Sequence, residues 1–328
     1  MRKFIILALL AMAFYITGCQ APKIRLFPSQ ADPLEEYSLE GEGLQKILVI
    51  QMHGIISNTP REGWIRTKPS MVQEVVSQLR LAEKDNNVKA IILKIDSPGG
   101  SVTASDILYN EIAGYKKRTK AKVVVAMMGV AASGAYYIAL PADYIQAHPT
   151  TITGSIGVIF ARPKVTGLMQ KIGVDIEVNK SGSQKDMGSP FRPTSEEEKI
   201  IFQNLTDQLG DRFVNLVASH RNLEPEALDQ ISTARVFLAN EALELGMVDQ
   251  IGYLENAVDQ AKKLAGLDED ARVIVYRRTE YPDDNIYNTS TRYGDGKASL
   301  ISMELPGSFS QVQTGFFYMW PAVLTDDR

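Results

Sequence analysis

The stretch VKAIILKIDSPGGSV, residues 88–102, decides how this chain folds. Its first nine residues are mostly apolar and rich in β-branched side chains, a pattern typical of a parallel strand that is buried on both faces. Pro98, Gly99 and Gly100 then end the strand, and residues 101–117 have helical character. A buried strand followed directly by a helix is the repeating unit of an α/β protein.

The same alternation continues on both sides of this stretch, so we expect an α/β fold with a mainly parallel sheet and flanking helices. We expect further strands at 46–50 and 123–128, and a helix capped by Ser70 and Gln73. Residues 239–266 are expected to be helical, with breaks near Gly246 and Gly252. A long helix is expected to start after Thr194 and Ser195, with these apolar residues on one side: Ile200, Ile201, Leu205, Leu209, Phe213 and Leu216.

The composition excludes several classes of protein. Of 328 residues, 45% are hydrophobic and 23% are charged, which is ordinary for a globular protein. A net charge of −4 leaves no strongly basic surface, so nucleic-acid binding is not expected. One cysteine rules out an internal disulfide framework, and three widely spaced histidines show no metal-ligand spacing. We therefore expect neither a metal nor another cofactor.

The N-terminus has the layout of an export signal. Arg2 and Lys3 precede the apolar run 4–16, which ends in Thr17-Gly18-Cys19. These last residues resemble a bacterial lipobox, in which the cysteine thiol is acylated and the chain is cut before it. We expect residues 1–18 to be a lipoprotein signal peptide and Cys19 to carry the lipid, which anchors the protein in the cell envelope on the extracytoplasmic side of the inner or outer membrane. The alternative is an uncleaved signal anchor with a chance cysteine.

The rest of the chain divides by composition into three parts. Residues 19–45, with several prolines and glycines among polar residues, are expected to form a membrane-proximal linker. Residues 46–276 carry the α/β pattern and form the expected enzyme domain. Residues 277–328 are expected to be a tail that is partly disordered or forms an interface. Its aromatic cluster at 315–320 either marks that interface or packs back on the core of the same chain.

Three short segments carry residues suited to chemistry. Ser133 lies among small residues between a buried strand and a helix, where free N–H groups favour a nucleophile or an oxyanion, although it is also an ordinary helix cap. The loop 96–101 has two glycines that let a backbone N–H face a cleft, or it is a plain turn. Segment 180–190 contains lysines, and a lysine acts as a general base only when its surroundings lower its pKa.

Taken together, in this order, the segments resemble the bacterial signal peptide peptidase A family, whose members are membrane-associated serine peptidases with a Ser–Lys dyad. The matching stretches are IDSPGGSV (95–102), AASGAYYIA (131–139), TITGSIGV (151–158), KSGSQKDMGSP (180–190) and RVFLANEALELGMVDQIG (235–252). The resemblance implies that Ser133 is the nucleophile, Lys185 the general base and Ser155 the residue that orients the lysine. It also implies that the amides of Gly100 and Gly134 form the oxyanion hole.

The resemblance further implies a crotonase-like fold, as in the Clp peptidase, and a ring-shaped homo-oligomer that encloses the sites. The expected function is that of a membrane-anchored serine endopeptidase that cleaves apolar peptides such as remnant signal peptides. One departure is Ala135, where family members often have glycine. Two alternatives stay open: an acyl-CoA hydratase or isomerase of the crotonase type, because residues 241–249 also suit that group, and a catalytically silent, ring-forming lipoprotein scaffold.

Overall fold

The computed structural model describes residues 33–62, 67–281, 284–290 and 315–320. The expected signal peptide, residues 1–18, and the expected lipidation site, Cys19, lie outside the described residues. Both therefore stay predictions. Within the described part of the chain, no helix has the length and apolar character needed to cross a membrane.

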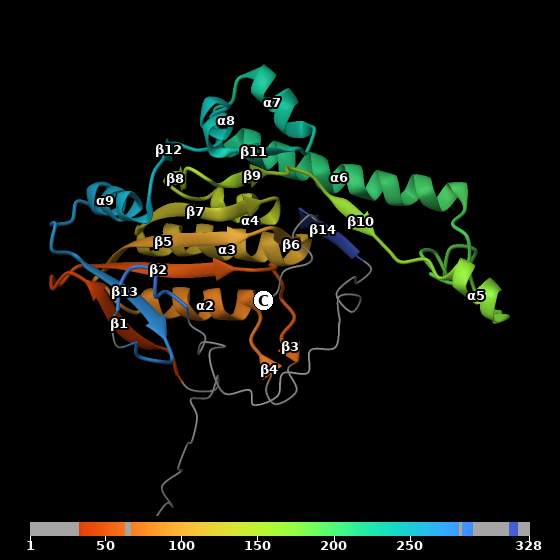
Figure 1. Ribbon diagram of the computed structural model, residues 1–328, viewed down its shortest axis with the longest axis horizontal. Coiled ribbons are helices and arrows are strands. Elements are labelled where there is room, and N and C mark those ends of the chain that lie inside the picture. Colours follow the sequence, from red (N-terminus) through yellow and green to blue (C-terminus); the bar gives the residue numbers. More distant parts are fainter. Residues whose placement is uncertain (1–32, 63–66, 282–283, 291–314, 321–328) are drawn as a thin grey trace, which may run out of the picture.

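A large sheet forms the centre of the molecule, and most of its strand pairs are parallel (Figure 1). Its main path runs β1-β13-β2-β5-β7-β8-β12, and β9 extends it by pairing with both β7 and β11. The pairs β1–β13 and β9–β11 are antiparallel. The strands are β1 (Glu35–Glu40), β2 (Lys46–His53), β5 (Val88–Ser97), β7 (Lys122–Ala132), β8 (Tyr144–Ala147), β9 (Ile152–Gly154), β11 (Val236–Leu238), β12 (Gln250–Ile251) and β13 (Arg272–Arg277).

Helices cover both faces of this sheet. Leu48 and Ile50 of β2 pack in the larger apolar cluster together with α2 (Met71–Ala82), α3 (Val102–Thr119) and α4 (Gly134–Ala139). Ile47 and Val49 point to the opposite face, where α9 (Leu254–Ala265) covers them. Successive residues of a strand face opposite sides, so a strand covered on both faces is mostly apolar instead of alternating. The run 88–96 has that character for this reason.

The α/β fold class with a mainly parallel sheet and flanking helices is confirmed. Two helix starts predicted from sequence also form as expected. Ser70 and Gln73 make the capping box of α2, and Ser195 and Glu198 make the same arrangement at the start of α6 (Glu196–His220). Between 239 and 266 the chain forms α8 (Ala239–Glu244) and α9, separated at the two expected breaks.

Part of the segment expected to be a linker, residues 19–45, is a strand. Residues 35–40 form β1, which pairs with β13 at the edge of the sheet. Tyr37 and Leu39 alternate with polar residues, and both are partly buried against the α9 side of the sheet. The alternation includes only two apolar residues among several charged ones, so the sequence pattern did not predict strand β1.

An arm extends from the central body, on the right of Figure 1. It starts at β10 (Ile159–Ala161), continues through α5 (Thr166–Ile172) and an irregular segment, and returns along α6. The apolar side predicted for α6 is buried only in its second half: Phe213 is fully buried, whereas Ile200 is 62% and Leu205 is 39% exposed. The first half of the helix therefore belongs to the arm and leaves apolar residues uncovered.

The root of the arm belongs to a second, three-stranded sheet. Its order is β10-β14-β6, with β14 (Gly315–Met319) antiparallel to both β10 and β6 (Gly99–Ser101). Of the two alternatives for the aromatic cluster at 315–320, the one found in this chain is packing against its own core. The remaining short elements are the hairpin of β3 (Arg61–Glu62) and β4 (Thr67–Lys68), and helix α7 (Pro225–Ser232).

Candidate active site

Ser133 lies at the junction of β7 and α4 in an unusual backbone conformation. Its φ of 55° and ψ of −118° are costly for a residue with a side chain, and such strain collects at functional positions. The residue is 1% exposed, and its Oγ has no hydrogen-bond partner within the described residues. A buried hydroxyl normally has a partner, so this one is available to a group that binds there.

Ser155 lies beside Ser133 because β9 runs parallel to β7. Ala132 and Gly154 are paired in the register of the two strands, so the next residue of each strand leaves the sheet at the same edge. The backbone N–H of Ser133 donates to the carbonyl of Gly154 at 2.7 Å. Ser155 also has a positive φ, 53°, and its N–H donates to the carbonyl of Arg235 at 2.8 Å. The parallel register thus brings two of the predicted site residues together.

Gly100 and Gly134, the predicted oxyanion-hole residues, also meet at this point. A methyl group added to Gly134 would lie 3.3 Å from the backbone nitrogen of Gly100 and 2.4 Å from Oγ of Ser105. A methyl group on Gly100 would lie 1.9 Å from the carbonyl oxygen of Ile56. A side chain at Gly100 would overlap the backbone of Ile56, and one at Gly134 would require Ser105 and the nearby backbone to shift. The two backbones approach closely directly beside Ser133, as an oxyanion hole requires.

Strand β14 runs across this site. Its residue Tyr318 is in register with Gly100, and the Tyr318 carbonyl oxygen would lie 3.0 Å from a methyl group on Gly134 and 2.1 Å from one on Gly99. The same antiparallel strand pairs with β10 on its other side. A peptide carbonyl of this chain therefore lies next to the backbone of Gly100 and Gly134. This contact could not be predicted from the sequence, because the tail carries no recognisable motif.

The side chain of Tyr318 fills an aromatic pocket formed by α4 and α6. Its ring stacks on Tyr137 with centroids 5.1 Å apart and lies 4.8 Å from Phe213, and the residue is fully buried. The hydroxyl donates to the carbonyl of Leu209 at 3.0 Å. Burial raises the pKa of Tyr318 to about 12, so the phenol stays neutral. The pocket accepts a large apolar side chain with one polar tip.

Lys185 lies on the arm, in the irregular segment between α5 and α6, and it is exposed. Its backbone N–H donates to the carbonyl of Gly182 at 3.1 Å, within a series of turns. Since Oγ of Ser133 has no hydrogen-bond partner in the described chain, the Lys185 amine does not bond to it. The structure thus brings together four of the five predicted catalytic residues, whereas the exposed Lys185 makes no hydrogen bond to Oγ of Ser133.

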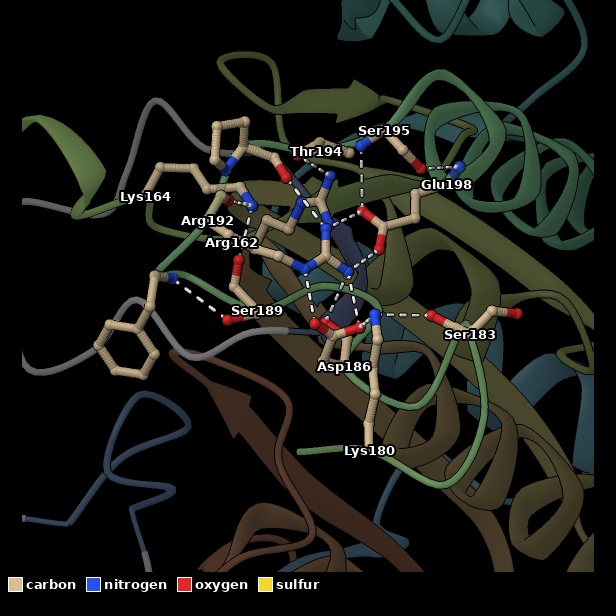
Figure 2. A network of polar contacts seen from close by, with 12 residues as sticks. Arg162, Lys164, Lys180, Ser183, Asp186, Ser189, Arg192, Thr194, Ser195 and Glu198 are labelled. Carbon is tan, nitrogen blue, oxygen red and sulfur yellow. Dashed lines mark hydrogen bonds and ion pairs between the residues drawn. The ribbon is translucent and has the colours of Figure 1, made fainter. Parts of the chain in front are cut away.

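A polar network next to Lys185 was not foreseen from the sequence. Figure 2 shows Arg192 between the carboxylates of Asp186 and Glu198, with Lys180 on the other side of Asp186. The residues are charged and close in sequence, a pattern that a solvated surface loop shares. Only the fold shows that their side chains converge.

His53, at the end of β2, pairs with Asp96 at 3.4 Å, and the hydrogen bond to His53 is the main cause that lowers the pKa of Asp96. Asp96 also accepts a hydrogen bond from the N–H of Val130 at 3.0 Å, which braces β7 ahead of Ser133. Within the described residues, no three His, Cys, Asp or Glu side chains are grouped so that they could hold a metal ion.

Comparisons of the sequence with a family profile and with known proteins point to the same family of peptidases. The sequence profile described as Peptidase family S49 matches residues 115–268. A protein of Enterococcus faecium named signal peptide peptidase SppA is 38% identical over 77% of this chain and 73% of its own length. Protease 4 of Haemophilus influenzae is 34% identical over 81% of this chain, which corresponds to 42% of that protein. Among solved structures, a ClpP1 variant from Listeria monocytogenes covers 64% of this chain and 94% of its own, with 22% identity and a TM-score of 0.41.

Proposed function

The chain belongs to peptidase family S49 and is a serine peptidase, and from this premise we propose that it is a membrane-anchored endopeptidase with a Ser–Lys dyad that cleaves extended apolar peptides. Ser133 is the nucleophile, Lys185 the general base and Ser155 the residue that orients the lysine. The amides of Gly100 and Gly134 form the oxyanion hole. Lipid on Cys19 anchors the enzyme on the extracytoplasmic side of a membrane of the cell envelope, where remnant signal peptides are available.

The observation that carries this proposal is the position of β14. An extended segment of the chain lies between β6 and β10, with the carbonyl of Tyr318 against Gly99 and Gly134 and beside Ser133. Addition of a peptide strand to two strand edges is a general mode of peptide recognition. A substrate that takes the place of β14 presents its scissile carbonyl to Oγ of Ser133. The side chain of the residue that carries this carbonyl enters the aromatic pocket, as that of Tyr318 does.

The reaction follows from these positions. The base removes the hydroxyl proton of Ser133 as Oγ attacks the carbonyl carbon, and the resulting oxyanion accepts hydrogen bonds from the two glycine amides. The same base then gives its proton to the leaving amine, which departs with the C-terminal part of the substrate and leaves an acyl-enzyme. A water molecule, activated in the same way, hydrolyses this ester and releases the N-terminal part.

We further propose that a neighbouring copy of the chain in a ring supplies Lys185. A lysine accepts a proton at neutral pH only in apolar surroundings, and in the single chain this side chain is exposed. The arm that carries it also exposes large apolar residues, including Leu168, Ile172 and Ile200. Such a patch favours contact with another protein surface. Packing of one arm against the next copy covers these residues and desolvates the lysine.

A fluorophosphonate probe tests the proposal against the two alternatives. We expect the probe to label Ser133 covalently and Ser133→Ala to abolish labelling, because the reaction requires an activated serine hydroxyl. An acyl-CoA hydratase or a silent scaffold does not label. Mass spectrometry of the labelled peptide identifies the residue, and labelling at another serine would contradict the assignment. The mass of the mature N-terminus tests the anchor, because an unmodified Cys19 still joined to Gly18 excludes lipidation.

A further inference from the structure

An ion-pair network lies directly beside Lys185 (Figure 2). Asp186 accepts hydrogen bonds from Nζ of Lys180 at 2.7 Å and from Nε and Nη2 of Arg192 at 2.7 and 2.9 Å. The same guanidinium donates to both carboxylate oxygens of Glu198, with Nη1 to Oε2 at 3.2 Å. One arginine therefore links the residue that follows Lys185 to a second carboxylate.

That second carboxylate belongs to a rigid element. Glu198 is in the first turn of α6 and is 1% exposed. Its backbone N–H donates to Oγ of Ser195 at 3.1 Å, and its carboxylate accepts from the N–H of Ser195 at 3.3 Å, which completes the helix cap. The network therefore ends at the start of a 25-residue helix, not in another loop.

The network also holds the backbone next to Lys185. Nη2 of Arg192 donates to the carbonyl of Asp186 at 3.2 Å, and that same carbonyl accepts the N–H of Ser189 at 3.0 Å. On the other side, the N–H of Lys185 donates to the carbonyl of Gly182 at 3.1 Å. A planar guanidinium that grips carboxylates through two nitrogens fixes their direction as well as their distance.

The charges of this network persist across the neutral pH range. Hydrogen bonds from Arg192 are the main cause that lowers the pKa of Asp186 and also that of Glu198. The two cations, Lys180 and Arg192, balance the two carboxylates. Ion pairs of this kind add little net stability compared with apolar contacts, but they specify geometry. The fixed geometry of this network is relevant to catalysis because the adjacent residue, Lys185, is the proposed base.

We propose that Asp186 and Arg192 are positioning residues for Lys185, which hold the backbone of the base at a fixed place relative to α6. This inference rests on the proposed function, in which Lys185 takes the proton of Ser133. A general base acts only within hydrogen-bond reach of the proton it removes, and a misplacement of about 1 Å can lower a rate roughly 100-fold. An exposed irregular segment cannot supply that precision without cross-links.

The test compares Asp186→Asn with Asp186→Glu in the full-length enzyme, using an apolar fluorogenic peptide. We expect Asp186→Asn to lower kcat by about 10- to 100-fold with KM within about twofold, because the lysine is misplaced while the peptide groove is intact. Asp186→Glu keeps the charge and is expected to restore much of kcat. Arg192→Lys, which keeps the charge but loses the planar fork, should resemble Asp186→Asn. Thermal unfolding and the mass of the oligomer are measured for each variant.

The matched control is Lys199→Gln, which removes a different ion pair at the start of the same helix. Lys199 pairs with Glu196 at 2.7 Å, and both side chains are mostly exposed, so kcat should stay unchanged. If Lys185→Ala retains activity, the proposed dyad fails. If Lys185→Ala is inactive and Asp186→Asn keeps the kcat of the wild type, only the positioning role fails. A kcat that falls in step with the melting temperature in Asp186→Asn and Asp186→Glu alike would also overturn it.

Discussion

Mixing two inactive variants tests whether the reacting serine and lysine come from different copies of the chain. Ser133→Ala and Lys185→Ala each remove one member of the proposed dyad, so each variant alone should have almost no peptidase activity. Among the residues that the structure describes, none is a partner for the buried Oγ of Ser133, whereas Lys185 is exposed on the arm. If a neighbour supplies the lysine, a mixed ring regains complete sites wherever the two variants lie side by side in the right order.

The size of the effect follows from counting. In a random equimolar ring, half of the copies keep Ser133, and half of their neighbours on the arm side keep Lys185, so about one quarter of the sites are complete. We therefore expect roughly 25% of the wild-type kcat with an unchanged KM. The two variants are co-expressed with different affinity tags, purified over both tags in succession and assayed with an apolar fluorogenic peptide.

A second mixture controls for assembly. Ser133→Ala combined with Lys199→Gln, which keeps both dyad residues, should recover about half of the wild-type kcat, because only the serine is missing from half of the sites. Recovery in this control together with no recovery from Ser133→Ala plus Lys185→Ala would refute supply of the lysine from a neighbour. The arm would then have to bring Lys185 to Ser133 within one chain.

Three further outcomes are expected. Ending the chain at residue 314 removes β14 from between β6 and β10, so kcat/KM on an apolar peptide should rise several-fold in steady-state assays; an unchanged value would mean that β14 does not block the working site. Tyr136→Phe removes a fully buried hydroxyl that donates to the carbonyl of Met247 at 2.8 Å, so denaturant unfolding should show a loss of about 1–3 kcal/mol. His53→Gln should leave the pH–rate profile at neutral pH unchanged. Because the bond to His53 depresses the pKa of Asp96, that carboxylate contributes stability above its unfolded pKa, about 4, and loses it as the pH falls through the lower folded value; in His53→Gln, acid unfolding followed by circular dichroism should move to higher pH.

The sequence predicted most of the fold because the signals for these elements are local. The run 88–96 is mostly apolar on both faces, and it forms β5 in the middle of the sheet. The spacing from Ser70 to Gln73 is enough to complete a helix cap, and both hydrogen bonds of the cap are present. These signals depend on a few neighbouring residues and not on the tertiary partner.

The second sheet could not be predicted in the same way. Strand β14 pairs Tyr318 with Gly100 and Phe317 with Ile159, residues that are far apart along the chain. A short aromatic run predicts that the segment is buried, but it does not predict which strand pairs with it. Pairing between segments so far apart along the chain has no local sequence signal. As a result the sequence left open whether the cluster at 315–320 formed an interface or packed on its own chain.

The same limit explains why Lys185 could be named from sequence but not placed. Ser133 and Ser155 follow paired residues of parallel strands, so the sheet register alone brings them together. Lys185 has no such link, and it lies on an arm whose helix leaves Ile200 largely exposed, contrary to the expected apolar face. An apolar helix face predicts that the face is buried but does not predict which surface covers it. In the same way, a lysine that acts as a general base requires desolvation, but the sequence does not show which surface provides it. A neighbouring copy that covers the arm satisfies both requirements at once. If the proposed ring forms, the exposed apolar face of the arm and the exposed Lys185 have the same explanation, and the mixed-variant experiment tests it.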